Sequence, residues 1–152
     1  NYIALVAGKD RDEDVGYYGE KLVLHLTELG LSSCWVALTF KKIKSAYRVN
    51  NGEKLYLVVA FGYSDNTGSA HKSRAREEVM SAQNPPAWFL DGIDAALLAP
   101  TAMNQQKFRF SLTDSNKVKA ECSFAPYSRI DLGIAKYHFE VGAGKENFTF
   151  AE

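Results

Sequence analysis

Apolar residues along the chain follow two periods, and these periods predict strands and helices in alternation. Continuous apolar runs at Tyr2–Ala7 and Leu55–Tyr63 are typical of strands that are covered on both faces of a sheet. We expect the first run to be a central strand. Between the two runs, after a charged loop at Lys9–Val15, apolar side chains recur at helical spacing until Gly30 offers a helix end. The residues expected to face the sheet are Tyr18, Leu22, Leu26 and Leu29.

The second half of the chain predicts a helix, a β-hairpin and a closing helix. Pro85-Pro86 can start a helix that contains Trp88–Leu98, and Pro100 must end it because proline has no backbone N–H. Two alternating runs, Phe108–Leu112 and Val118–Phe124, predict the hairpin. The remaining elements are expected at Ser128–Val141, as a helix that Gly142 and Gly144 close, and at Asn147–Phe150, as an edge strand.

Composition indicates a globular protein without a strong charge. The chain has 152 residues, 46% of them hydrophobic, and its 18 basic residues balance its 18 acidic ones. Such a balance provides no bulk field that would recruit nucleic acid or an anionic membrane. No apolar run is long enough to cross a membrane, and no basic-then-apolar signal opens the sequence.

Cysteine and histidine usage suggests no disulfide or metal site. Cys34 and Cys122 lie in apolar or strand-like surroundings without a CxxC spacing, which fits buried thiols in a reducing, cytoplasmic compartment. We expect His138 to be a core or interface histidine, because neither a second histidine nor an acid neighbours it at metal spacing. The basic run at Lys41–Lys44 is expected to be solvated surface.

The most unusual chemistry lies between the helix end at Leu98 and the strand at Phe108. Thr101, Asn104, Gln105 and Gln106 place one hydroxyl and three carboxamides within six residues. Amides carry both donors and acceptors, so they could read the edge of a planar ligand. The alternative is a self-bonded loop whose amides cap the helix end and the turn.

A second candidate, Lys72-Ser73-Arg74, has the chemistry of a phosphate site. The lysine offers a point charge, the arginine a planar fork and the serine a neutral donor. Alternatively, these residues start an exposed helix in which Arg74 pairs with Glu78 four residues later. The segment could also bind a nucleotide phosphate, although no glycine-rich turn between a strand and a helix accompanies it.

A third candidate is the short connection Leu31-Ser32-Ser33, which directly follows the predicted helix end. The small serine side chains would let backbone N–H groups approach a ligand closely. The alternative is a plain connection from helix to strand, with Trp35 in the core.

These segments resemble the FMN-dependent nitroreductase family. Ala99–Gln106 is similar to its Pro-Ser/Thr-x-x-Asn-x-Gln motif, in the form found in a subgroup with two fused halves. Tyr17–Glu20 with Leu29–Trp35 resembles the family's helix and its Leu-Gly-Leu-Gly-x-Cys-Trp loop, and Ile130–Glu140 resembles the closing helix of that subgroup. The sequence departs from the family in having Gln-Lys-Phe for Gln-Pro-Trp and Ser32 for glycine.

The resemblance implies an α+β fold, a three-layer α/β/α sandwich with a mixed or antiparallel central sheet flanked by helices. It also implies an FMN cofactor, with NAD(P)H and a small nitroaromatic, quinone or similar acceptor as partners. The implied cofactor-binding residues are Lys72, Ser73 and Arg74 at the phosphate, Leu31, Ser32 and Ser33 facing the ring, and Pro100, Thr101, Ala102, Asn104 and Gln106 as the opposite wall. No catalytic acid, base or metal is implied, because the flavin carries the chemistry.

By the same resemblance, residues 1–152 are expected to be the C-terminal portion of a longer protein. We expect a flavin-facing strand and helix unit at 1–83 and a helix-hairpin-helix unit at 84–152, with the N-terminal half of the chain, or a second subunit, completing the site. Two alternatives stay open: a degenerate half that contributes only packing and dimerisation, or a flavin-binding module without turnover.

Overall fold

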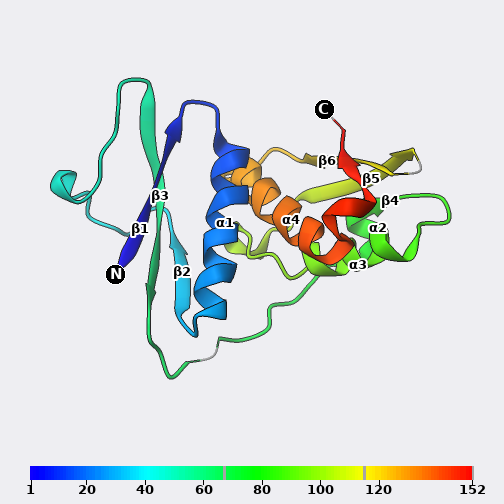
Figure 1. Ribbon diagram of the computed structural model, residues 1–152, viewed down its shortest axis with the longest axis horizontal. Helices are drawn as coiled ribbons and strands as arrows, with labels where there is room; N and C mark the ends of the chain where they lie inside the picture. Colours follow the sequence, from blue (N-terminus) through cyan, green and yellow to red (C-terminus); the bar gives the residue numbers. More distant parts are fainter. Residues whose placement is uncertain (67, 115, 152) are drawn as a thin grey trace.

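A computed structural model describes residues 1–66, 68–114 and 116–151 (Figure 1). Its strands are β1 (Tyr2–Gly8), β2 (Ser32–Val36), β3 (Glu53–Gly62), β4 (Met80–Ser81), β5 (Phe108–Asp114), β6 (Lys117–Cys122) and β7 (Thr149–Phe150). Its α-helices are α1 (Asp12–Glu28), α2 (Arg76–Val79), α3 (Ala87–Ala96) and α4 (Ser128–Ala143). Single 3₁₀ turns cover Lys44–Ala46, Ala102–Asn104 and Lys145–Asn147.

The first three strands form an antiparallel sheet with β3 in the middle. Leu57, Val58 and Val59 of β3 are buried, as a strand with apolar residues on both faces should be. The prediction that the first run, Tyr2–Ala7, is central is wrong, because β1 pairs only with β3 among the described strands. The expectation that both faces of this strand are covered is also wrong, because no residue of β1 is buried.

Helix α1 starts earlier and packs through a different face than the sequence suggested. It begins at Asp12 inside the predicted charged loop, where three acidic residues in the first turn favour the positive end of the helix dipole. Leu26 is buried as expected, but Tyr18, Leu22 and Leu29 are exposed. The buried face instead comprises Val15, Gly16, Gly19, Glu20, Val23 and Leu26.

The reason for this change of face is that α1 lies between the first sheet and α4 (Figure 1). A Cβ atom at Gly16 would lie 2.0 Å from the Ile130 carbonyl oxygen, and one at Gly133 would lie 1.9 Å from the Glu13 carbonyl oxygen. The two helices therefore approach backbone to backbone, and glycine marks the contact that apolar spacing does not reveal.

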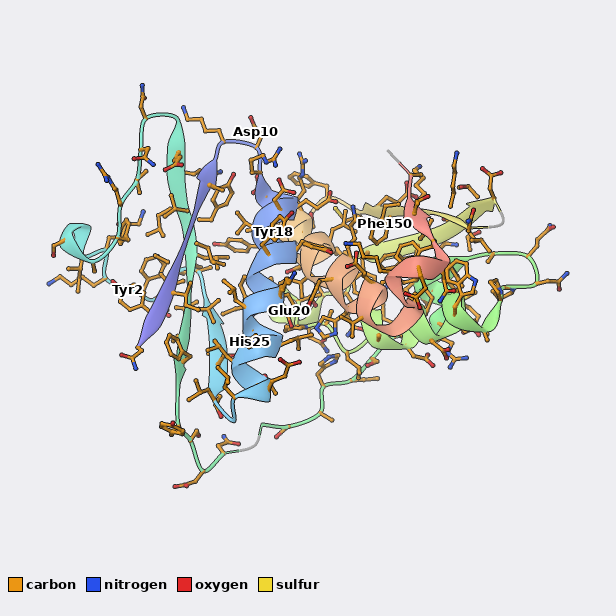
Figure 2. All side chains as sticks on the ribbon, viewed as in Figure 1. Tyr2, Asp10, Tyr18, Glu20, His25 and Phe150 are labelled. Atoms are coloured by element: carbon orange, nitrogen blue, oxygen red, sulfur yellow. The ribbon has the colours of Figure 1, made fainter. Side chains whose placement is uncertain are left out.

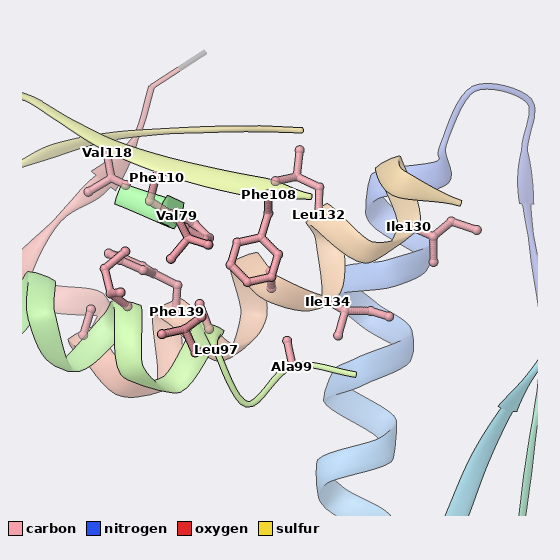
Figure 3. Packing of buried hydrophobic residues seen from close by; sticks show 14 of the residues in the cluster. Val79, Leu97, Ala99, Phe108, Phe110, Val118, Ile130, Leu132, Ile134 and Phe139 are labelled. Carbon is pink, nitrogen blue, oxygen red and sulfur yellow. The ribbon is translucent and has the colours of Figure 1, made fainter. Parts of the chain in front are cut away.

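The second sheet has the order β4-β5-β6-β7 and mixes parallel and antiparallel pairs. The predicted hairpin and edge strand are confirmed, although Ser115 in the predicted turn lies outside the described residues. Between this sheet, α3 and α4 is a core of aromatic rings, in which Phe110 stacks on Phe139 with ring centroids 4.6 Å apart (Figure 3). Gly92 allows close packing of α3 on α4, since a Cβ there would lie 2.7 Å from the Phe139 ring.

The predicted α+β class is confirmed, but the expected single central sheet is not what the described residues form. They form two sheets, with α1 and α4 between them (Figure 1). The prediction that Cys34 is buried is also wrong, because this residue is exposed. Cys122 is half-buried, and both cysteines are free thiols. None of the helices in the described residues is long and apolar enough to span a membrane.

Candidate functional site

The site is organised around the turn between α3 and β5, which we call the corner (Pro100–Gln106). Its backbone is held in the left-handed region at Met103, Asn104 and Gln106, with φ angles of 52°, 53° and 45°. Tyr127, just before α4, also has a positive φ of 62°. Such conformations cost non-glycine residues free energy, so the surrounding structure must over-determine them.

Asp131 on α4 is one of the groups that fix the corner. Its side-chain oxygens accept hydrogen bonds from the Ala102 backbone N–H at 3.0 Å and from Gln105 Nε2 at 2.6 Å. The residue is only 4% exposed. Burial raises the pKa of the Asp131 carboxyl, while the two hydrogen bonds from Ala102 and Gln105 oppose that rise.

The amides of Asn104 and Gln106 bind to the predicted phosphate segment. Asn104 Nδ2 and Gln106 Nε2 both donate to the Lys72 carbonyl, each at 2.8 Å. Gln106 Oε1 accepts from the Arg74 backbone N–H at 2.9 Å, and Gln106 Nε2 also donates to Asn104 Oδ1. These two amides are therefore bonded within the protein, as in the self-bonded alternative, but they join the corner to a segment 32 to 34 residues away and do not cap the helix end.

The side chains of Lys72, Ser73 and Arg74 differ in the hydrogen bonds and ion pairs that they form within the protein. Ser73 Oγ donates to the Leu97 carbonyl at 3.1 Å. The Arg74 guanidinium lies 3.8 Å from a Glu78 oxygen, as the helical alternative expected, and donates to the Gln105 carbonyl at 3.4 Å. The helix there is only the four-residue α2, and the Lys72 residue is exposed.

Leu31, Ser32 and Ser33 are not brought to the corner. Ser32 and Ser33 open strand β2, and the three residues line a polar hollow that also includes Ser64 and Asn66. The corner borders a different hollow. Of the three predicted groups of site residues, the structure thus brings two together and leaves the third apart.

That hollow, which we call the cavity, has a volume of about 250 Å³ and lies between the corner, the end of β2 and the start of α4. Its lining is mostly apolar. It is lined by Trp35, Val36, Ala37, Leu57, Pro100, Thr101, Ala102, Met103, Tyr127, Ile130, Asp131 and Ile134.

Trp35 is held in the cavity wall by groups behind it. Its indole Nε1 donates to Glu20 Oε2 at 3.1 Å, and the other Glu20 oxygen lies 2.8 Å from His138 Nε2. Glu20 is 1% exposed and sits on the side of α1 that faces α4 (Figure 2). Gly19 leaves room for the indole, since a Cβ there would lie 2.4 Å from it.

His138 is therefore a hydrogen-bonded core histidine, as predicted. Sequence reasoning missed Glu20 and Asp131, the two buried acids that hold the cavity's walls. A signal was present for both: each acid lies among apolar and glycine residues in the face that its helix buries.

The candidate residues can be compared with the needs of FMN. The charges of Lys72 and Arg74 suit a phosphate dianion, but the Ser73 hydroxyl and the Arg74 N–H already donate within the protein. The apolar wall of Pro100, Thr101 and Ala102 suits a flat ring. The charge and the wall each suit a part of FMN, but the Arg74 side chain lines a separate hollow with Gln106 and Arg109 and not the cavity. The amides that were expected to read the ring edge are committed elsewhere.

Comparison with known proteins gives a consistent result. A family model described as "Putative TM nitroreductase" matches residues 1–143. The crystal structure of "a putative nitroreductase" from Thermotoga maritima matches with a TM-score of 0.73 and 24% identity, which shows a shared fold. That match covers 95% of this chain and 61% of the other, so this chain spans about three fifths of its relative's length. No curated protein matches the sequence. Since the family model spans nearly the whole sequence, the chain belongs to the family of nitroreductases that this model describes.

Proposed function

We propose that this chain forms part of an FMN-dependent oxidoreductase that passes electrons from NAD(P)H to a nitroaromatic, a quinone or a similar small aromatic acceptor. Family membership supports the oxidoreductase class. The observation that carries the proposal is the junction of Lys72–Arg74 with the corner through the Asn104 and Gln106 amides. It joins a cationic segment suited to a phosphate with a turn suited to a ring.

In this proposal the chain's residues bind and orient, and none acts as an acid or a base. Lys72 and Arg74 would hold the phosphate by charge-assisted hydrogen bonds, with Ser73 beside them. Pro100, Thr101 and Ala102 would form one wall for the ring, and the apolar lining of the cavity would exclude water from its neighbourhood. When bound, FMN supplies the hydride and electron transfer that side chains cannot provide.

The remaining contacts would come from a body other than residues 1–152. Leu31, Ser32 and Ser33 line a separate hollow, so they would face a ring only where another body completes that hollow. We propose that this body is the N-terminal half of a longer chain or a second subunit. The proposed enzyme works in the cytoplasm and needs neither nucleic acid nor a membrane.

A second candidate function is a structural half that packs and dimerises without binding flavin. The inward hydrogen bonds of Asn104 and Gln106 favour it, because they leave those amides fewer groups to offer a ligand. A third alternative is a module that binds flavin but does not catalyse electron transfer.

A titration with FMN, followed by the loss of flavin fluorescence, tests these candidates. We expect this chain alone to be inactive, and the complete protein, with the proposed second half or subunit present, to bind FMN. In that complete protein the double variant Lys72→Ala/Arg74→Ala should bind FMN at least about tenfold more weakly, because charge-assisted hydrogen bonds are lost. Riboflavin, which lacks the phosphate, should bind both proteins equally. The matched control Lys41→Ala/Lys42→Ala removes two exposed cations elsewhere and should change nothing.

The outcomes separate the candidates. Oxidation of NADH or NADPH with a nitroaromatic or quinone, in the presence of FMN, would support the enzyme. FMN binding without turnover would support the module, and failure to bind FMN would overturn the flavin proposal. Unchanged FMN affinity in the double variant would contradict the phosphate site.

A further inference from the structure

Helix α1 carries a second apolar stripe that the described residues leave largely uncovered. Tyr18, Leu22 and Leu29 are 60%, 41% and 59% exposed, and the exposed His25 lies among them in the sequence (Tyr18 and His25 are labelled in Figure 2). We call these four residues the stripe. The core uses a different face of the same helix, so the stripe is free to contact a partner.

The spacing of the stripe is that of a helix that packs against another helix. Its members are separated by four, three and four residues, which is the spacing of the a and d positions of a heptad. Leu22 and Leu29 take a positions, and Tyr18 and His25 take d positions. Side chains in this pattern interdigitate with the same pattern on a second helix.

Helix α4 turns the side of the stripe into a groove. A hollow of about 440 Å³ runs beside it, lined by Tyr18, Lys21, Leu22, His25 and Glu28 of α1 and by Tyr137 of α4. It shares no lining residue with the cavity. A partner helix would therefore contact α1 and the edge of α4 together, at a place separate from the candidate site.

The charges beside the stripe indicate which helix fits it. Lys21 and Glu28 occupy the two g positions, whereas Gly19 and Leu26 at the e positions are uncharged. Among the ion pairs of the described residues, none involves Lys21, and Glu28 pairs only with the exposed His25.

These charges are complementary to those of a second, antiparallel α1. In an antiparallel pair the g positions of the two helices face each other, so Lys21 of each copy meets Glu28 of the other. A parallel pair would instead place Lys21 against Leu26. The antiparallel arrangement also has two-fold symmetry, which closes the assembly at two copies.

We propose that a second copy of this chain docks on the stripe, with the two α1 helices antiparallel. Leu22 of each copy then faces His25 of the other, and Tyr18 faces Leu29. This interface does not depend on the proposed function, because it involves neither FMN nor the residues of the corner and the cavity.

Reversal of the g-position charges tests the interface in the purified full-length protein, whose mass is followed by sedimentation. We expect dimers to form as the concentration is raised into the roughly millimolar range, where even weak interfaces associate. Lys21→Glu and Glu28→Lys should each weaken association about tenfold, because both ion pairs become repulsive. The double variant Lys21→Glu/Glu28→Lys should restore it, and the exposed control Lys42→Glu should change nothing.

A second variant tests the apolar contact. Leu22→Asp should weaken association at least about tenfold, because it buries an unpaired charge in the interface. Circular dichroism should show an unchanged fold, since Leu22 is already 41% exposed.

Three outcomes would overturn the proposal. They are a protein that stays monomeric at every concentration, as it would if another part of its own chain covered the stripe, a dimer that Leu22→Asp leaves intact, and a double variant that associates no better than the single ones. FMN titration is a separate readout, so either proposal can fail alone.

Discussion

The two walls of the cavity are held by buried acids, but the two acids have different partners. On the β2 wall, Glu20 accepts from the Trp35 indole and contacts His138, a side chain that can carry a positive charge. On the corner wall, Asp131 accepts only from neutral donors. The acid of the β2 wall therefore has an ionisable partner, whereas the acid of the corner wall has only dipolar partners and borders the cavity.

This difference in partners suggests that Glu20 mainly stabilises the fold and that Asp131 mainly affects binding and pH dependence. A buried acid with an ionisable partner needs nothing further, and losing that partner is costly. A buried acid that has only dipolar partners carries a desolvation cost, which is the kind of cost that functional sites often retain. Changes at the β2 wall should therefore affect stability most, and changes at the corner should affect pH dependence and binding.

The largest effect is expected from His138→Leu, which removes the one ionisable partner of buried Glu20 and leaves it only the Trp35 indole. We expect unfolding to become easier by roughly 3–5 kcal/mol at neutral pH, measured by urea denaturation. The matched control is His25→Leu on α1, whose pair with Glu28 is exposed and worth at most about 1 kcal/mol. Equal losses in the two variants would mean that the Glu20 pair is not a structural tie.

Gly133→Ala should act on both walls at once, since α1 carries Glu20 and α4 carries Asp131. The added methyl would meet the Glu13 carbonyl oxygen, a backbone atom that cannot swing aside, so the helices must part. We expect a loss of about 1–3 kcal/mol in a thermal or urea unfolding experiment. Gly62→Ala, where a Cβ meets nothing within 4 Å, is the control and should cost far less. A small cost at Gly133 would show that the helices are not in backbone contact.

The smallest effect concerns the pH dependence of the corner wall. Because the pKa of Asp131 is raised by burial, the folded state binds the proton more tightly than the unfolded state. Protonated Asp131 therefore stabilises the folded state. This contribution to the free energy of unfolding is present in full below the ordinary aspartate pKa and is lost as pH rises through the raised value, by at most about 1.4 kcal/mol per pH unit.

Asp131→Asn should remove this slope. The measurement compares unfolding free energies of the variant and the unmodified protein across the acid range, with Asp65→Asn as the control. A variant whose stability follows the same pH curve as the unmodified protein would show that the Asp131 carboxyl does not titrate as expected.

Local sequence patterns predicted the elements better than their arrangement. The strand at Leu55–Tyr63 and the hairpin after Phe108 follow from alternation and apolar runs, which act over a few residues. The position of β1 at an edge and the division into two sheets depend on which elements meet in space. The exposed face of α1 at Tyr18 and Leu22 was misjudged because Gly16 and Gly19, which carry no apolar side chain, mark its buried face.

The candidate site was predictable only in part, for a related reason. The sequence pointed to Lys72–Arg74 and to the corner, and these segments do lie together. What it could not indicate is that Asn104 and Gln106 would use their amides to make that junction, since a carboxamide serves a ligand or a backbone equally well. The acids behind the walls carry a local signal in their apolar and glycine neighbours, but the partners that satisfy them, such as His138, are distant in the sequence.

The backbone contact between Gly16 and Ile130 has a consequence for how the chain could be divided. A single crossing of the backbone connects the elements before Tyr63 to those after Ala75. The packing of α1 against α4 also holds the two parts together. If that crossing were cut, the helix pair would still offer an extensive surface for reassociation. Fragments separated at this point should therefore be able to complement each other, as the two parts of a split reporter do.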